Sequence, residues 1–99
     1  MAHLPVEFEP AATDEAQDAY RWYAKRSQRA ADAFIAELDR AVLAISEHPL
    51  QFATYLHGTR RFLLKRYPYA VVYRDSPILI QVIAVAHAKR RPGYWKSRV

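Results

Sequence analysis

The chain has 99 residues, a length that suits one domain with one modest core. Hydrophobic residues make up 52% of it and charged residues 25%, which excludes a disordered tail, and the absence of cysteine excludes disulfides and thiolate metal sites. Acidic residues at positions 7, 9, 14 and 15 interrupt any signal peptide, and no apolar run is long enough to cross a bilayer. We therefore expect a soluble, cytoplasmic protein with no membrane partner.

The net charge of +5 conceals a strong asymmetry along the chain. Residues 1–57 carry five Lys and Arg against nine Asp and Glu, whereas residues 58–99 carry ten against Asp75 alone. A field of this sign attracts nucleic acid, an acidic protein or a lipid surface. A solvated basic face without function is the alternative, but the ratio favours a polyanionic or acidic partner.

The first half of the chain predicts a short strand and two helices. Apolar residues alternate over positions 4–8, as in a half-buried strand. Pro10 suits the first turn of a helix over residues 10–26, and Ser27 suits the N-cap of a second helix that ends before Pro49. Two helices with so short a connection form an antiparallel hairpin.

The second half predicts a loop followed by three strands. Residues 48–60 show no clean period and are expected to form a loop. Strands are predicted over residues 61–67, 69–74 and 78–87, with a turn at residues 75–77 between the last two.

The last predicted strand organises the fold. Its run from Ile78 to Ala86 contains one polar residue, Gln81, which is typical of a strand covered on both faces. The first strand fits beside it in parallel, with the helices as a right-handed crossover. The expected architecture is α+β, in the order β-α-α-β-β-β, with a helical hairpin packed on one face of a twisted, mainly antiparallel four-stranded sheet. The C-terminal segment or a partner would cover the other face.

The basic cluster in the last third is compatible with a nuclease. Arginine or lysine would stabilise a phosphorane, and a tyrosine or histidine would move the proton. The candidate residues are Arg61, Lys65, His87, Arg90 and Tyr94. A single carboxylate in this region argues against a two-metal nuclease, and the four histidines lack metal-ligand spacing, so we expect no metal or other cofactor. His87 at a strand end also fits a structural role.

The same cluster is equally compatible with a non-catalytic docking surface. Arginine, tyrosine and tryptophan give large contact areas and planar hydrogen bonding at interfaces. The contacts would come from Arg90, Arg91, Lys96 and Arg98, with Tyr94 and Trp95 as anchors. The alternative for Trp95 is a lid packed over the sheet.

Four segments together resemble the RelE/ParE toxins of type II toxin–antitoxin modules. They are Arg61-Phe62, Tyr67-Pro-Tyr-Ala-Val-Val-Tyr73, Val82-Ile-Ala-Val-Ala-His87 and Arg90-Arg-Pro-Gly-Tyr-Trp95. The helical hairpin that ends at His48-Pro49 also fits, so the resemblance covers nearly the whole chain as a single toxin domain over residues 1–99. It implies the same β-α-α-β-β-β fold.

The family divides by target, and the resemblance to its ribonuclease branch is partial. RelE-like members are metal-independent, ribosome-dependent mRNA endoribonucleases that use strand lysines, two arginines and a tyrosine. Arg61 falls at the first lysine position and Leu63 at the second, Ala70 and Ala88 occupy the two arginine positions, and Tyr94 matches the tyrosine. Losing a fixed guanidinium costs orders of magnitude in rate when no metal stabilises the charge. The sequence therefore looks nearer to the ParE-like branch.

The ParE resemblance implies a non-catalytic toxin of the kind associated with plasmid stabilization. It would inhibit growth by binding and poisoning DNA gyrase, and a cognate ParD-like antitoxin would neutralise it in a hetero-oligomer. The target-binding residues predicted on this basis are Arg90, Arg91, Tyr94, Trp95 and Arg98. The alternatives are a RelE-like ribonuclease acting on the ribosome, and an inactive relic that only binds the antitoxin.

Overall fold

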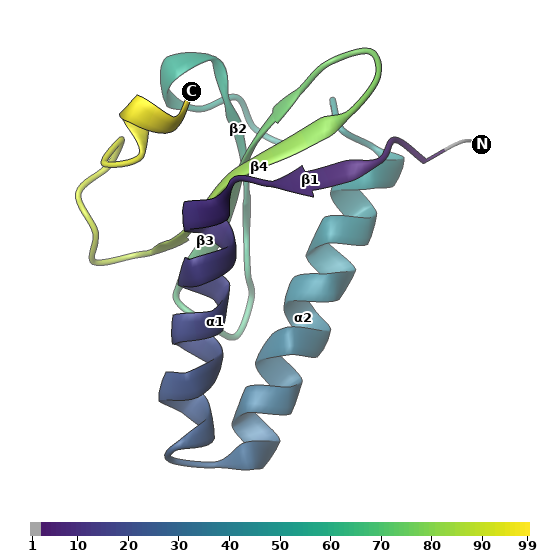
Figure 1. The fold of residues 1–99 in the computed structure, drawn as a ribbon. Helices are drawn as coiled ribbons and strands as arrows, with labels where there is room; N and C mark the ends of the chain where they lie inside the picture. Colours follow the sequence, from purple (N-terminus) through teal and green to yellow (C-terminus); the bar gives the residue numbers. More distant parts are fainter. Residues whose placement is uncertain (1–2) are drawn as a thin grey trace.

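The computed structural model describes residues 3–99, and its order of elements confirms the β-α-α-β-β-β prediction (Figure 1). Two helices and four strands are joined by short connections, with a 3-10 turn before the second strand and another near the C-terminus. The elements are β1 (Val6–Phe8), α1 (Pro10–Ala24), α2 (Gln28–Glu47), β2 (Arg60–Leu63), β3 (Tyr69–Asp75) and β4 (Ile80–His87), with 3-10 turns at Leu56–Gly58 and Lys96–Arg98.

The two helices begin where local chemistry predicts, although α1 ends at Ala24 and not at residue 26. Pro10 occupies the first turn of α1, where its missing N–H is not needed. The Ser27 side chain accepts a hydrogen bond from the backbone N–H of Ala30 at 3.2 Å and so caps α2. Within residues 3–99, neither helix combines the length and the apolar character that a membrane crossing requires.

The strands form one mixed sheet in the order β1-β4-β3-β2. β1 pairs with β4 in parallel, as expected for a crossover through the helical hairpin, and the other pairings are antiparallel. β4 therefore lies between two neighbours, which confirms the central position predicted from its apolar run.

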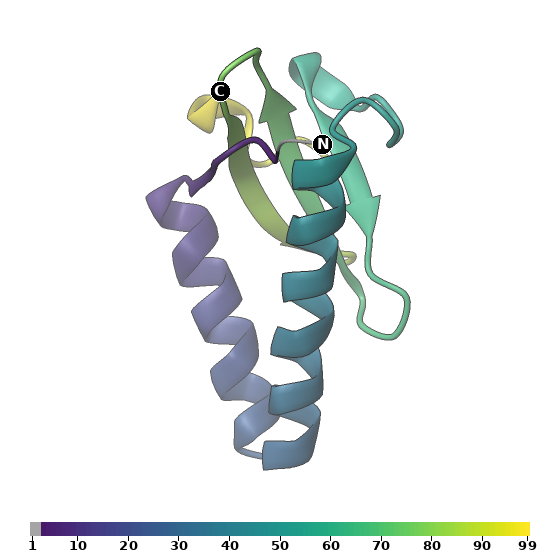
Figure 2. The ribbon, with the colours of Figure 1, turned by 90° about the vertical axis from the view of Figure 1, so that its right-hand side faces the viewer.

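The sheet carries a hydrophobic cluster on each face. The larger cluster lies under the helices and contains Phe34, Tyr73 and Val82 among its buried side chains. The smaller one lies on the opposite face, where Trp95 packs on Val72, Ile83 and Ala84, and none of these four residues is more than 1% exposed. Figure 2 shows the helices on one side of the sheet and the yellow C-terminal segment behind it. The C-terminal segment thus covers the second face of β4.

The second strand is shorter than predicted, and a contact from α2 explains why. β2 ends at Leu63, whereas the sequence predicted a strand to residue 67. Beyond it, the Glu37 carboxylate accepts hydrogen bonds from the backbone N–H groups of Lys65 at 2.6 Å and Arg66 at 3.2 Å. Burial alone would raise the pKa of Glu37, but these N–H groups and the Arg66 side chain lower it on balance. The carboxylate thus turns the chain where alternation predicted a strand.

The last strand also starts later than predicted. β4 begins at Ile80 instead of residue 78, and Ile78 is 73% exposed in the preceding turn. The Ser76 hydroxyl lies 3.2 Å from the backbone nitrogen of Leu79, which donates to it, and the Ser76 N–H donates to the Leu79 carbonyl at 3.0 Å. This local pairing lengthens the turn because a serine side chain offers the backbone an alternative to the sheet ladder.

Candidate functional site

A cleft lies on the sheet face opposite the helices, between the strands and the segment that follows β4. We call it the basic cleft, and it encloses about 290 Å³. Small and apolar residues such as Ala70, Val72 and Ala86 line it together with several aromatic side chains and three arginines. Its charged and aromatic lining comes from Tyr55, Arg61, Tyr67, Tyr69, His87, Arg90, Arg91, Tyr94 and Trp95, and no carboxylate of the described residues lines it.

Two arginines of the basic cleft stack on tyrosine rings. The guanidinium carbon of Arg61 lies 4.2 Å from the ring centroid of Tyr55, and that of Arg90 lies 3.8 Å from the ring centroid of Tyr94. In the part of the chain that the structure describes, the ion pairs involve other cations, and none uses Arg61, Arg90 or Arg91. The guanidinium groups of Arg61 and Arg90 are therefore oriented by aromatic rings, and all three arginines keep their donors for an anionic partner.

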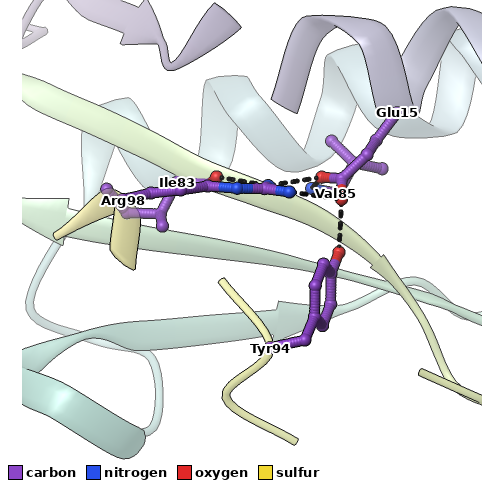
Figure 3. Close-up of polar contacts among 5 residues, drawn as sticks. All are labelled: Glu15, Ile83, Val85, Tyr94 and Arg98. Atoms are coloured by element: carbon purple, nitrogen blue, oxygen red, sulfur yellow. Dashed lines mark hydrogen bonds and ion pairs between the residues drawn. The ribbon is translucent and has the colours of Figure 1, made fainter. Parts of the chain in front are cut away.

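A largely buried carboxylate from α1 fastens the C-terminal segment to the sheet (Figure 3). One Glu15 oxygen, Oε1, accepts hydrogen bonds from the backbone N–H of Val85 at 3.0 Å and from Arg98 at 2.9 Å. The other, Oε2, accepts from the Tyr94 hydroxyl at 2.5 Å and from Arg98 at 3.1 Å. The Glu15 and Arg98 side chains are only 15% and 17% exposed, so this bidentate ion pair is largely removed from water. We call these contacts the Glu15 latch.

The Glu15 latch occupies the edge of β4 where β1 has ended. The last paired residue of β1, Phe8, lies opposite Val82, and the pairing of β4 with β3 skips Ile83 at a bulge. Arg98 donates to the Ile83 carbonyl at 3.1 Å, and Glu15 accepts from Val85. Side chains thus replace the strand contacts that a longer β1 would have made, so the Ile83 carbonyl and the Val85 N–H have hydrogen-bond partners.

The latch changes the acid–base properties of its members. Burial, followed by the hydrogen bond to Glu15, raises the pKa of the Tyr94 hydroxyl well above its usual range. The hydrogen bond to Glu15 likewise raises the pKa of the Arg98 guanidinium. Tyr94 therefore remains a protonated donor to a carboxylate, which is unfavourable for a general base.

The structure brings four of the five nuclease candidates to one site. Arg61, His87, Arg90 and Tyr94 line the basic cleft, but Lys65 does not. Lys65 is exposed in the turn after β2. The His87 ring meets Tyr69 edge to face with centroids 4.9 Å apart, and its Nδ1 atom accepts from the backbone N–H of residue 89 at 3.0 Å. Within residues 3–99, no three His, Asp or Glu side chains gather as a metal site requires.

The residues predicted to bind a target divide into two groups. Arg90 and Arg91 are exposed beside the basic cleft. Trp95 is 1% exposed and forms a lid over the sheet, as the alternative reading of the sequence proposed, and Arg98 is engaged by the latch. Tyr94 is half-buried and belongs to both, because it supports Arg90 and binds Glu15.

Sequence reasoning missed two members of the site, Glu15 and Tyr55. Glu15 lies three residues after Ala12 and four before Ala19, both buried, so it sits on the core-facing stripe of α1. A lone carboxylate on such a stripe is the signal that could have found it, because buried charges are paired. Tyr55 falls in the loop before β2 and carries no comparable signal.

Comparisons with known proteins agree with this architecture. The sequence profile of the ParE toxin of type II toxin–antitoxin system, parDE, matches residues 6–92. The fold is similar to a solved structure described as the chromosomal ParDE TA system from P. aeruginosa, with a TM-score of 0.76 and 16% sequence identity over 88% of this chain and 98% of that chain. A comparison with curated protein sequences gives no match. Because the profile spans the chain from β1 past the end of β4, the chain belongs to the ParE family of toxins of type II toxin–antitoxin systems.

Proposed function

We propose that this toxin binds and poisons DNA gyrase, and that a ParD-like antitoxin neutralises it in a hetero-oligomer. The observation that carries the proposal is the basic cleft, in which three arginines that have no ion-pair partner among residues 3–99 surround a small apolar floor. Exposed arginines backed by aromatic rings are typical of the central contacts of protein interfaces. Binding to an anionic target needs only this surface.

Turnover of RNA is less well supported by the same site. The Tyr94 hydroxyl donates to Glu15 and has a raised pKa, so it is poorly suited to accept a proton. The positions at which the ribonuclease branch places arginines hold Ala70 and Ala88. The floor of the cleft therefore lacks the fixed cations that would stabilise a phosphorane.

The proposal predicts that purified toxin blocks supercoiling by gyrase and leaves ribosome-bound mRNA intact. Replacing Arg90 and Arg91 together by alanine should weaken gyrase inhibition without changing the thermal midpoint of unfolding, because both side chains are exposed. The matched control is Arg29→Ala, which removes an exposed cation from α2 at the far end of the helical hairpin.

Cleavage of ribosome-bound mRNA together with unaffected gyrase would overturn the proposal in favour of the ribonuclease branch. Failure of the toxin to slow growth when expressed without its antitoxin would favour the inactive relic. Antitoxin neutralisation is tested separately, by adding the purified antitoxin to the supercoiling assay and measuring whether gyrase activity returns.

A further inference from the structure

The Glu15 latch joins α1 to both ends of the segment that forms the wall of the basic cleft. Its donors are Val85 in β4, just before the segment begins, and Tyr94 and Arg98 toward its end. The residues between them include Arg90, whose guanidinium lies against the Tyr94 ring. One carboxylate therefore restrains the backbone on either side of the exposed arginines.

This carboxylate is not needed to fill the main core. That core consists of apolar side chains under the helices, and the buried neighbours of Glu15 on α1 are the alanines at positions 12 and 19. Removing a carboxylate from water costs free energy that must be recovered through hydrogen bonds, and Glu15 recovers it with four bonds to three different residues. All three of these residues belong to β4 or to the segment after it.

Tyr94 transmits the restraint to the cleft. The Tyr94 hydroxyl donates to Glu15 Oε2 at 2.5 Å, which fixes that end of the side chain. The guanidinium carbon of Arg90 lies 3.8 Å from the centroid of the Tyr94 ring. The Arg98 guanidinium, held by the same carboxylate, lies 5.3 Å from this centroid. The orientation of the Tyr94 ring, and with it the position of the Arg90 guanidinium, thus depends on a residue of α1 that does not line the basic cleft.

We propose that Glu15 is a positioning residue for target binding: its carboxylate holds the segment from residue 88 to residue 98 closed, so that Tyr94 presents Arg90 at the cleft. The inference rests on the proposed function for its consequence, gyrase inhibition, but the closed state of the segment can be measured without gyrase. Without the latch, the segment would populate open forms in which Arg90 is not in place. The apparent affinity of the toxin for its target would then fall in proportion to the fraction of molecules that remain closed.

The chain contains two tryptophans, which makes the state of the segment directly measurable. Trp95 belongs to the segment and is 1% exposed when the segment is closed on the sheet, whereas Trp22 is 52% exposed on α1. In a Trp22→Phe background, Trp95 is the only tryptophan, and acrylamide quenching of its fluorescence reports opening. We expect Glu15→Gln to raise the quenching constant several-fold while far-UV circular dichroism stays unchanged. If about a tenth of the molecules stay closed, the toxin concentration that inhibits gyrase by half should rise about tenfold.

The matched control is Asp18→Asn, which removes an acidic residue from the same helix. Asp18 is 76% exposed and pairs only with Arg21 among the described ion pairs, so neither quenching nor inhibition should change. A graded series guards against misfolding of Glu15→Gln: Tyr94→Phe removes one hydrogen bond to Glu15 and Arg98→Lys keeps the charge but loses the bidentate geometry. Quenching and loss of inhibition should rise together across the series.

Two results would overturn the inference. If Trp95 stays protected from acrylamide in the Glu15→Gln, Tyr94→Phe and Arg98→Lys variants, the carboxylate does not hold the segment closed. Trp95 that becomes accessible while gyrase inhibition stays unchanged would show that closure does not position the binding surface. A wild-type toxin without effect on gyrase refutes the proposed target instead, and the quenching series still tests the latch.

Discussion

Replacing Trp95 by alanine separates the two roles that the sequence allowed for this residue. In the structure, the indole is 1% exposed and packs against Val72, Ile83 and Ala84 on the face of the sheet that the helices leave open. If it is a lid, the substitution destabilises the fold. If it is a surface contact in solution, the substitution removes binding and leaves stability unchanged.

The magnitude follows from the packing. Truncation of a buried tryptophan to alanine costs about 3–5 kcal/mol, which combines the lost transfer free energy with the cavity left behind. We expect Trp95→Ala to lower the free energy of unfolding by about 3 kcal/mol, because the cluster is small and the C-terminal segment can partly collapse into the cavity. For a domain of this size the thermal midpoint should fall by about 12–24 °C.

Urea denaturation followed by far-UV circular dichroism measures the loss without depending on tryptophan fluorescence. The control is Trp22→Ala, because Trp22 is 52% exposed and its main contacts are a stacked Arg26 and an edge-to-face Tyr23. That variant should lose no more than about 1 kcal/mol. Equal stability of the two variants, with gyrase inhibition lost only in Trp95→Ala, would refute the assignment of Trp95 as a lid.

Three further changes test other parts of the fold. The folded structure lowers the carboxyl pKa of Glu37 below its ordinary value of 4.5, so the stability that this carboxylate contributes is present above pH 4.5 and is lost as the pH falls through the lower folded value. Glu37→Gln should therefore reduce the loss of unfolding free energy between pH 7 and pH 3. An unchanged loss would contradict this. Ser27→Ala removes the N-cap of α2 and should lower the free energy of unfolding, measured by urea denaturation, by about 1 kcal/mol. An unchanged free energy of unfolding would show that the cap does not form. Tyr73→Phe removes a hydrogen bond of 2.6 Å to the Pro49 carbonyl and should lower the free energy of unfolding by about 1–2 kcal/mol. The loss should be the same at every pH up to 9, because burial raises the pKa of this tyrosine to about 12 and keeps its hydroxyl protonated. A loss that vanishes by pH 9 would argue against a protonated donor.

The sequence predicted the fold well wherever local pattern and burial agree. The apolar run that contains Gln81 correctly indicated the central strand, and Ser27 correctly indicated the start of α2. β2 was predicted too long because Glu37, more than twenty residues away in sequence, binds the backbone at residues 65 and 66. Periodicity describes only neighbours in sequence, so it cannot show a contact of this kind.

The candidate site was only partly predictable for the same reason. Four of the residues that the sequence singled out in the last third, Arg90, Arg91, Tyr94 and Trp95, line the basic cleft. The sequence could not show which cations remain without partners, because that depends on where the acidic residues of the first half lie. Glu15 binds Arg98, whereas Arg90 and Arg91 have no ion-pair partner within residues 3–99.

The segment that covers the second face of the sheet comes late in the chain, and this position has a consequence for biosynthesis. Residues 88–98 are made after every strand and helix on which they pack, and translation delivers residues at about 5–20 per second. Before they emerge from the ribosome, the Glu15 carboxylate has neither Tyr94 nor Arg98 to bind. The basic cleft is therefore incomplete until residues 88–98 have emerged, and a chain cut short before residue 88 would contain the residues of every strand and of both long helices but lack this surface.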